Sequence, residues 1–108
     1  MKKGEIRIID LPESSGNEKM GSKPSVIIAE VDPEIANIIP LTSNIQALRY
    51  PNTLLIEPSP ENGLKSESII LVFQIRAISK FRILNKIGEL EEDLIKNIDK
   101  ILIQMLKL

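Results

Sequence analysis

The chain has 108 residues, with 14 Lys and Arg against 15 Asp and Glu, and its formal net charge at pH 7 is −1. This length predicts one domain with a single hydrophobic core. The absence of cysteine and histidine excludes disulfides, thiolate metal sites, cysteine catalysis and histidine-based acid–base chemistry. Because the charge is balanced, any nucleic-acid site has to be a local patch and not a global field.

The first residues predict no secretory h-region, because Gly4 and Glu5 directly follow Met1–Lys3 and an alternating pattern starts at once. No apolar run approaches the roughly 20 residues that a membrane-spanning helix needs. We therefore expect a cytoplasmic protein with no membrane partner.

Most of the chain predicts short strands separated by turns. Alternation of apolar and polar residues, or short continuous apolar runs, indicates strands at 4–11, 25–31, 35–41, 53–57, 68–78 and 82–87. The polar segment 12–22 is predicted to be a long loop, and Thr42–Asn44 can cap a helical turn at 45–48. Several short strands with intervening turns are typical of a small barrel.

In the last twenty residues the spacing of the apolar side chains changes. Apolar residues between 89 and 108 recur at steps of three and four, which predicts an amphipathic helix with Gly88 as a modest cap. Acidic residues crowd its first turn, where they complement the positive end of the helix dipole. Together, the predicted strands and this helix indicate a mostly β barrel closed by one C-terminal helix.

A glycine-containing polar loop leads through Lys23 and Pro24 into the apolar strand at 25–31. It places charges of both signs, among them Glu18, and two flexible glycines at the mouth of a rigid element. Functional residues concentrate in loops of this kind.

Four segments, in order, resemble the PemK/MazF family of toxin endoribonucleases. Lys3–Ile6 is similar to the family's Arg-Gly-Asp-Ile/Val start, and Asn17–Pro24 is similar to its Glu-Gln-x-Gly-x-Arg-Pro loop. Pro40–Ser43 resembles its third-strand end. Ser68–Leu84, with Gln-Ile-Arg and Lys-Phe-Arg, is similar to its Val-x-x-x-Gln-Ile-Arg-x-Ile-Asp-Lys-x-Arg-Leu run. The resemblance spans residues 1–108 as one domain and implies an SH3-like small β-barrel with a C-terminal α-helix.

Proteins of that family cut single-stranded RNA without a metal, are usually homodimers, and are silenced by an antitoxin in the RNA groove. The resemblance therefore implies an endoribonuclease without cofactor or metal, with single-stranded RNA, an antitoxin and a second copy of itself as partners. The products would carry 2′,3′-cyclic phosphate and 5′-hydroxyl ends.

The resemblance also implies site residues. Lys23 takes the place of the family's catalytic arginine, and Thr42 that of its catalytic threonine. The residues expected to contact RNA are Asn17, Glu18, Ser43, Gln74, Arg76, Lys80 and Arg82. Gln74 and Arg76 would share one face of a strand, with Ile75 directed to the core.

Ordinary structural roles stay open for each of these residues. Lys23 also suits a solvated strand end, Thr42 a helix cap, and Gln74 with Arg76 a plain polar face. Lysine lacks the planar fork with which arginine grips two phosphate oxygens, so reduced activity is expected. The alternative function is a degenerate barrel that binds RNA or a protein partner without cleaving, and a purely structural barrel is the third.

Overall fold

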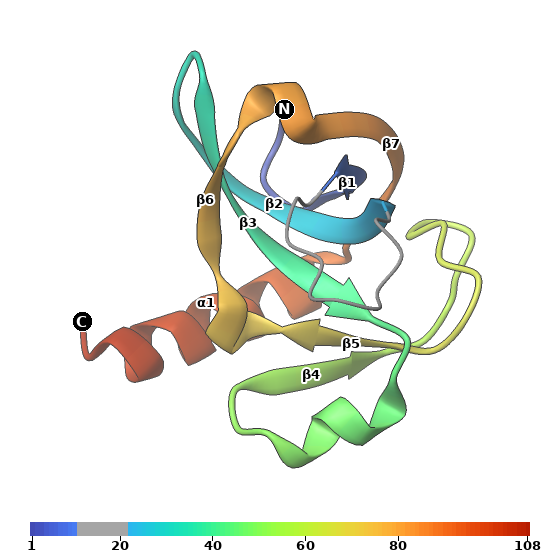
Figure 1. The fold of residues 1–108 in the computed structure, drawn as a ribbon. Helices are drawn as coiled ribbons and strands as arrows, with labels where there is room; N and C mark the ends of the chain where they lie inside the picture. Colours follow the sequence, from blue (N-terminus) through green and yellow to red (C-terminus); the bar gives the residue numbers. More distant parts are fainter. Residues whose placement is uncertain (11–21) are drawn as a thin grey trace, which may run out of the picture.

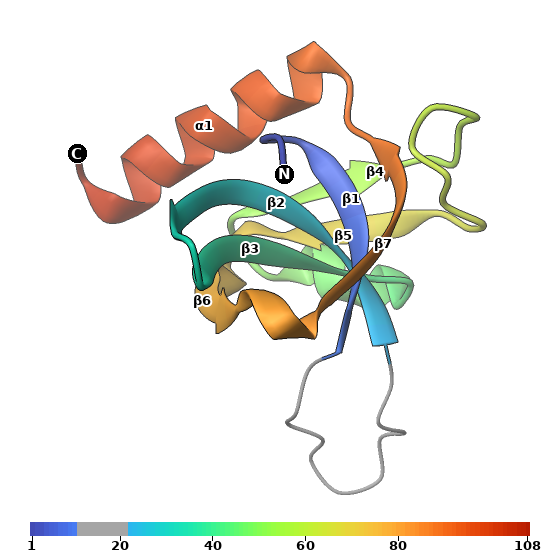
Figure 2. The same ribbon diagram turned by 90° about the horizontal axis from the view of Figure 1, so that it is seen from above.

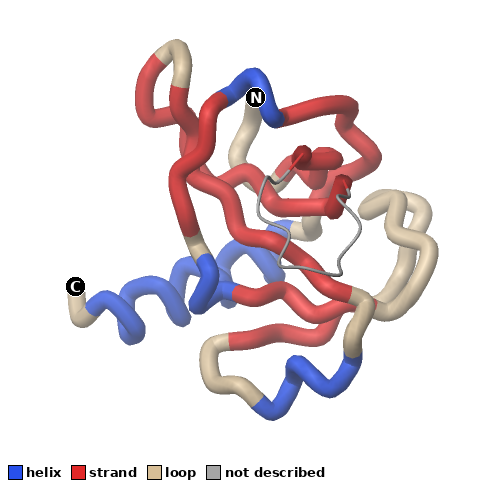
Figure 3. Tube along the Cα trace, in the orientation of Figure 1, coloured by secondary structure: helices blue, strands red, loops and turns tan. Residues whose placement is uncertain are grey.

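The computed structural model describes residues 1–10 and 22–108, and in this part a curled antiparallel sheet is followed by one long α-helix (Figures 1 and 3). The strands are β1 (Glu5–Asp10), β2 (Ser22–Asp32), β3 (Ile35–Thr42), β4 (Thr53–Ile56), β5 (Ser68–Leu71), β6 (Arg76–Ser79) and β7 (Ile83–Glu89). The short 3₁₀ helices are η1 (Ile45–Arg49), η2 (Val72–Gln74) and η3 (Lys80–Arg82), and the α-helix is α1 (Glu92–Leu106). The predicted mostly β fold with a C-terminal helix is confirmed.

The sheet has seven strands in the order β4-β5-β3-β2-β1-β7, and β6 also pairs with β3. Long β2 and β3 form its centre, joined by a tight turn in which the Asp32 carboxylate accepts from the amides of Glu34 and Ile35 at 2.7 and 2.9 Å. Figure 2 shows α1 along one side of the curled sheet, with its C-terminal end extending past the strands.

The predicted continuous strand at 68–78 is wrong, because η2 interrupts it. Both halves pair with the same edge of β3: β6 pairs with Ile35–Ile38, and β5 pairs with Leu41 and Thr42. Pro40 lies at this break, where its missing N–H is tolerated best. The sequence gives no local sign of the break, because the apolar run continues through η2.

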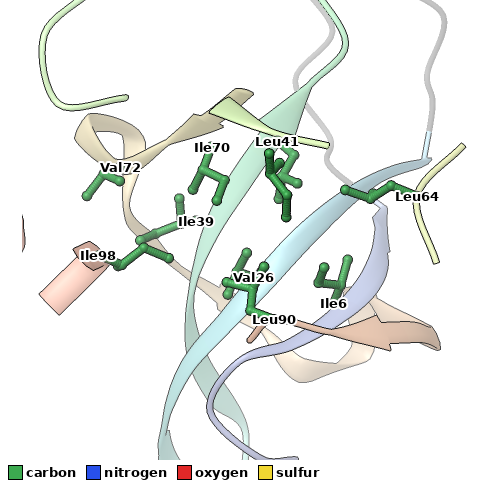
Figure 4. Close-up of a cluster of buried hydrophobic side chains, with 10 residues drawn as sticks. Ile6, Val26, Ile39, Leu41, Leu64, Ile70, Val72, Leu90 and Ile98 are labelled. Carbon is green, nitrogen blue, oxygen red and sulfur yellow. The ribbon is translucent and has the colours of Figure 1, made fainter. Parts of the chain in front are cut away.

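The main core lies between the sheet and α1. Ile98, which is 1% exposed, is the helix residue that enters it most deeply, alongside Ile39 and Val72 (Figure 4). Leu94, Ile95, Ile101 and Leu102 pack against the same cluster from the helix. The apolar spacing of the tail therefore reflects one helix face docked on the barrel.

The helix starts later than predicted. Glu91 is its N-cap residue, and Gly88 lies inside β7, so the prediction of Gly88 as the cap is wrong. Gly88 is needed for a different reason: an added Cβ would lie 2.3 Å from the carbonyl group of Asn62. No helix among the described residues has the length and apolar character to cross a membrane.

Candidate functional site

A pocket of about 540 Å³ opens where β2 begins and β3 ends. Beside it runs the 57–67 connection between β4 and β5, which Figure 1 draws at the right. Its apolar floor comes from Ile8, Leu41, Leu64 and Ile87. Its other described lining residues are Lys23, Pro24, Thr42, Ser43, Gly63, Lys65, Ser66 and Ser68. No Asp or Glu is among these lining residues, although the chain as a whole carries net negative charge.

Strand pairing brings Lys23 and Thr42 into the same pocket. On β2 and β3, Ser25 pairs with Pro40, Val26 with Ile39 and Ile27 with Ile38. Continued by two residues on each strand, this antiparallel register would align Lys23 with Thr42. Residues opposed in this way have Cβ atoms about 5 Å apart. A cation and a hydroxyl therefore face the pocket from neighbouring strands.

The hydroxyl of Thr42 accepts a hydrogen bond from the amide of Asn44 at 3.2 Å. The N-cap of η1 is Asn44 itself, whose side chain accepts from the amide of Gln46 at 3.1 Å. Thr42 thus supports the turn before the helix instead of capping the helix. Its hydroxyl proton is not used in that bond, so it can donate to a ligand in the pocket.

The 57–67 connection forms the far wall of the pocket. Asn62, which is 5% exposed, holds this connection in place. Its Oδ1 accepts from the amides of Ser59 at 3.0 Å and Leu64 at 2.9 Å, and its Nδ2 donates to the carbonyl of Glu57 at 2.9 Å. Gly63, at φ +70°, passes so close to β7 that a Cβ would lie 2.0 Å from the carbonyl oxygen of Ile87. The pocket wall is therefore a fixed part of the fold.

Two of the predicted RNA contacts lie away from the pocket. Gln74 is the last residue of η2, and Arg76 is the first residue of β6, so the prediction of a shared strand face is wrong. Ile75 between them packs against the main core, as expected. Arg76 on β6 pairs with Ile38 of β3, which lies four residues before Thr42 on β3.

Lys80 and Arg82 are the first and last residues of η3, and they too lie outside the described lining of the pocket. The ammonium of Lys80 and the α-amino group of Met1 both donate to the carboxylate of Glu30 and lower its pKa to about 2. Arg82 donates from Nη1 to the carbonyl of Asp10 at 3.4 Å. Lys80 is thus engaged in an ion pair with Glu30 at the protein surface. Asn17 and Glu18 lie outside the described residues.

Ser43 lines the pocket with Lys23 and Thr42, whereas Lys65, Ser66 and Ser68 were not among the predicted site residues. A lone lysine in a turn has no local signature of function. Leu64 is the one feature of the sequence that points to this wall: an apolar residue in a polar connection indicates that the connection folds back on the core.

The pocket combines two ammonium groups with several hydroxyls over an apolar floor. Such a set suits an anion, because lysine and hydroxyl groups donate to phosphate oxygens. Among residues 1–10 and 22–108, no three His, Cys, Asp or Glu side chains come together as a metal site.

A comparison with protein-family models identifies residues 2–106 as a PemK-like, MazF-like toxin of a type II toxin–antitoxin system. The chain belongs to this family. It is 28% identical to the endoribonuclease EndoA of Bacillus subtilis (strain 168), over 94% of this chain and 90% of that protein.

Solved structures of the family share the fold. The crystal structure of MazF from Deinococcus radiodurans superposes with a TM-score of 0.78 at 17% identity, covering 100% of this chain and 97% of that one. A mycobacterial endoribonuclease in complex with its cognate antitoxin gives a TM-score of 0.71 at 19% identity, covering 98% and 92%. The family resemblance of the sequence is therefore confirmed over nearly the whole chain.

Proposed function

We propose that this MazF-like protein is a metal-independent endoribonuclease that cleaves single-stranded RNA in the cytoplasm. The observation that carries the proposal is the pocket shared by Lys23 and Thr42, whose described lining holds cations and hydroxyls but no carboxylate. The similarity to a protein named an endoribonuclease supports RNA cleavage as the chemistry of this pocket.

Cleavage without a metal proceeds by attack of the ribose 2′-oxygen on the adjacent phosphorus. The bond to the 5′-oxygen breaks, the 2′-hydroxyl gives its proton to solvent water, and the departing oxygen takes a proton from a cationic donor in the pocket. The products are a 2′,3′-cyclic phosphate and a 5′-hydroxyl. Donors aimed at the phosphorane oxygens lower the barrier because they stabilise charge that develops only in the transition state.

In this scheme the Lys23 ammonium stabilises the phosphorane and can pass a proton to the leaving oxygen. The Thr42 hydroxyl holds a phosphate oxygen, and Ser43 lies beside it on the pocket wall. Asn17, Glu18, Gln74, Arg76, Lys80 and Arg82 remain proposed RNA contacts. For Lys80, a contact would require sharing or leaving its ion pair with Glu30.

The proposed assembly is a homodimer that an antitoxin neutralises by occupying the same pocket. A cationic pocket is suited to an acidic peptide segment as well as to RNA, because both present anionic groups. A peptide that binds there would compete directly with the substrate.

A decisive experiment is cleavage of a long single-stranded RNA by purified protein in EDTA, with the product ends mapped. Lys23→Ala and Thr42→Ala are expected to lower the rate by at least about 100-fold, the usual effect of losing one transition-state donor. Thr42→Ser should keep the hydroxyl and most of the activity. Lys100→Ala, at an exposed helix position, is the matched control.

The second candidate is a barrel that binds RNA or a protein partner without cutting it. Lysine at position 23, where the family has arginine, favours this alternative, as does the scarcity of aromatic residues for base stacking. Cuts by wild-type protein with 5′-hydroxyl ends, absent from Lys23→Ala, would exclude it. Binding of RNA without cuts by folded protein would establish it.

A further inference from the structure

The 57–67 connection separates two pockets of opposite character. On the side of α1, a pocket of about 320 Å³ is lined by the acidic side chains Glu57, Glu89 and Glu91. On the other side lies the cationic pocket with Lys23 and Lys65. The connection therefore presents a positive charge specifically toward the side where Lys23 and Thr42 lie.

The backbone on both sides of Lys65 is anchored. Leu64 is buried in the main core, and its amide is bonded to Asn62 at 2.9 Å. On the other side, the Ser68 hydroxyl donates to the carbonyl of Ser66 at 3.0 Å, and Ser68 is 5% exposed. A lysine between two such anchors has its Cα fixed relative to the pocket, and only its side chain is free to adjust.

The charge of Lys65 is not neutralised within the described part of the chain. None of the ion pairs among residues 1–10 and 22–108 includes Lys65, whereas Lys2, Lys3, Lys80 and Lys86 each pair with a carboxylate. An exposed cation that is rigidly mounted and unpaired on a pocket wall is available to a ligand. An internal ion pair would have to be broken first at the other four lysines.

We propose that Lys65 binds a backbone phosphate of the RNA next to the one that is cleaved. The proposal rests on the proposed function and adds a second phosphate position to it. Lys23 and Thr42 approach the pocket from the ends of β2 and β3, and Lys65 approaches from the opposite wall. Two cations on opposite walls can hold two phosphates of one strand, and in doing so they orient the ribose between them.

The test measures binding to an RNA oligonucleotide whose 2′-hydroxyls are methylated, so that it cannot be cut. The logarithm of the binding constant is plotted against the logarithm of salt concentration for wild type, Lys65→Ala, Lys65→Arg and Lys100→Ala. Loss of one phosphate contact reduces the slope by about 0.7 for a single strand. We expect this reduction for Lys65→Ala only, together with affinity lowered by about 5- to 10-fold at low salt.

Kinetics supply the second readout. Because Lys65 holds a neighbouring phosphate, Lys65→Ala is expected to raise KM more than it lowers kcat, and Lys65→Arg should restore both. Thermal unfolding checks that each variant is folded. An unchanged salt slope and KM for Lys65→Ala, with a wild type that binds and cuts RNA, overturns the role of Lys65 alone. A folded wild type that neither binds nor cuts RNA overturns both proposals.

Discussion

Gly88 of β7 lies directly against Asn62 in the 57–67 connection, so that a Cβ added to Gly88 would come within 2.3 Å of the Asn62 carbonyl carbon and oxygen. The amide of Glu89, the next residue, donates to the carbonyl of Glu61 at 2.9 Å. This close contact joins the last strand to the wall of the pocket. The position of that wall therefore depends on a glycine far away in the sequence.

Replacing Gly88 with alanine is expected to lower the free energy of unfolding by about 2–3 kcal/mol, because backbone and not a flexible side chain would have to move. Urea denaturation measures the change. Asn85→Ala, at an exposed position on the same strand, is the control and should stay within about 0.5 kcal/mol of wild type. Equal stability of the two variants would show that the strand and the connection can separate freely.

Asn62 should be the most sensitive polar residue of the 57–67 connection, because its side chain holds that connection in place. Asn62→Ala leaves the amides of Ser59 and Leu64 and the carbonyl of Glu57 without their partner, and we expect a loss of about 3 kcal/mol. Asn62→Asp keeps an acceptor for the two amides and should be less damaging. Asn97→Ala, on the exposed face of α1, is the control in the same denaturation series.

Much of the fold could be predicted because it is encoded locally. The alternating and continuous apolar runs predict β1 to β4 to within a few residues of their ends. The change in the spacing of apolar residues near the C-terminus predicts α1. The break at Val72–Gln74 could not be predicted, because it arises where β3 exchanges one edge partner for another. Gly88 was misassigned for a similar reason: its neighbour Asn62 is distant in sequence.

The site was less predictable than the fold. Lys23 and Thr42 were singled out through family resemblance, and only strand pairing places both on one pocket. Gln74 and Arg76 were assigned to a common face that the 3₁₀ helix removes. Lys65 was missed because its importance depends on how a turn folds back over the barrel, which nothing in its immediate sequence reveals.

The ion pair between Glu30 and Lys80 predicts a specific pH dependence of stability. The folded-state pKa of Glu30 is lowered from 4.5 to about 2, first by Lys80 and then by the α-amino group of Met1. A lowered carboxyl pKa means that the stabilisation is fully present above pH 4.5 and is lost as the pH falls toward 2.

Glu30→Gln should therefore be less stable than wild type at pH 7, and the two should converge as the pH approaches 2. Urea midpoints between pH 7 and pH 2 measure the difference. Glu34→Gln, at an exposed side chain that pairs with no described cation, is the control. A Glu30→Gln difference that stays constant over this pH range would mean that the ion pair does not stabilise the fold.

Lys23→Arg tests whether this MazF-like protein has kept a competent site. Arginine offers a planar fork that donates to two phosphate oxygens, whereas lysine acts as a point charge on a flexible stem. One additional charge-assisted hydrogen bond in the transition state, at about 1.4 kcal/mol, would raise the cleavage rate about tenfold. Single-turnover cleavage in EDTA, with Lys100→Arg as the matched control, measures the effect. A rate for Lys23→Arg at or below that of wild type would mean that the surrounding pocket is adapted to lysine, because the stronger donor then gains no productive contact with the phosphate.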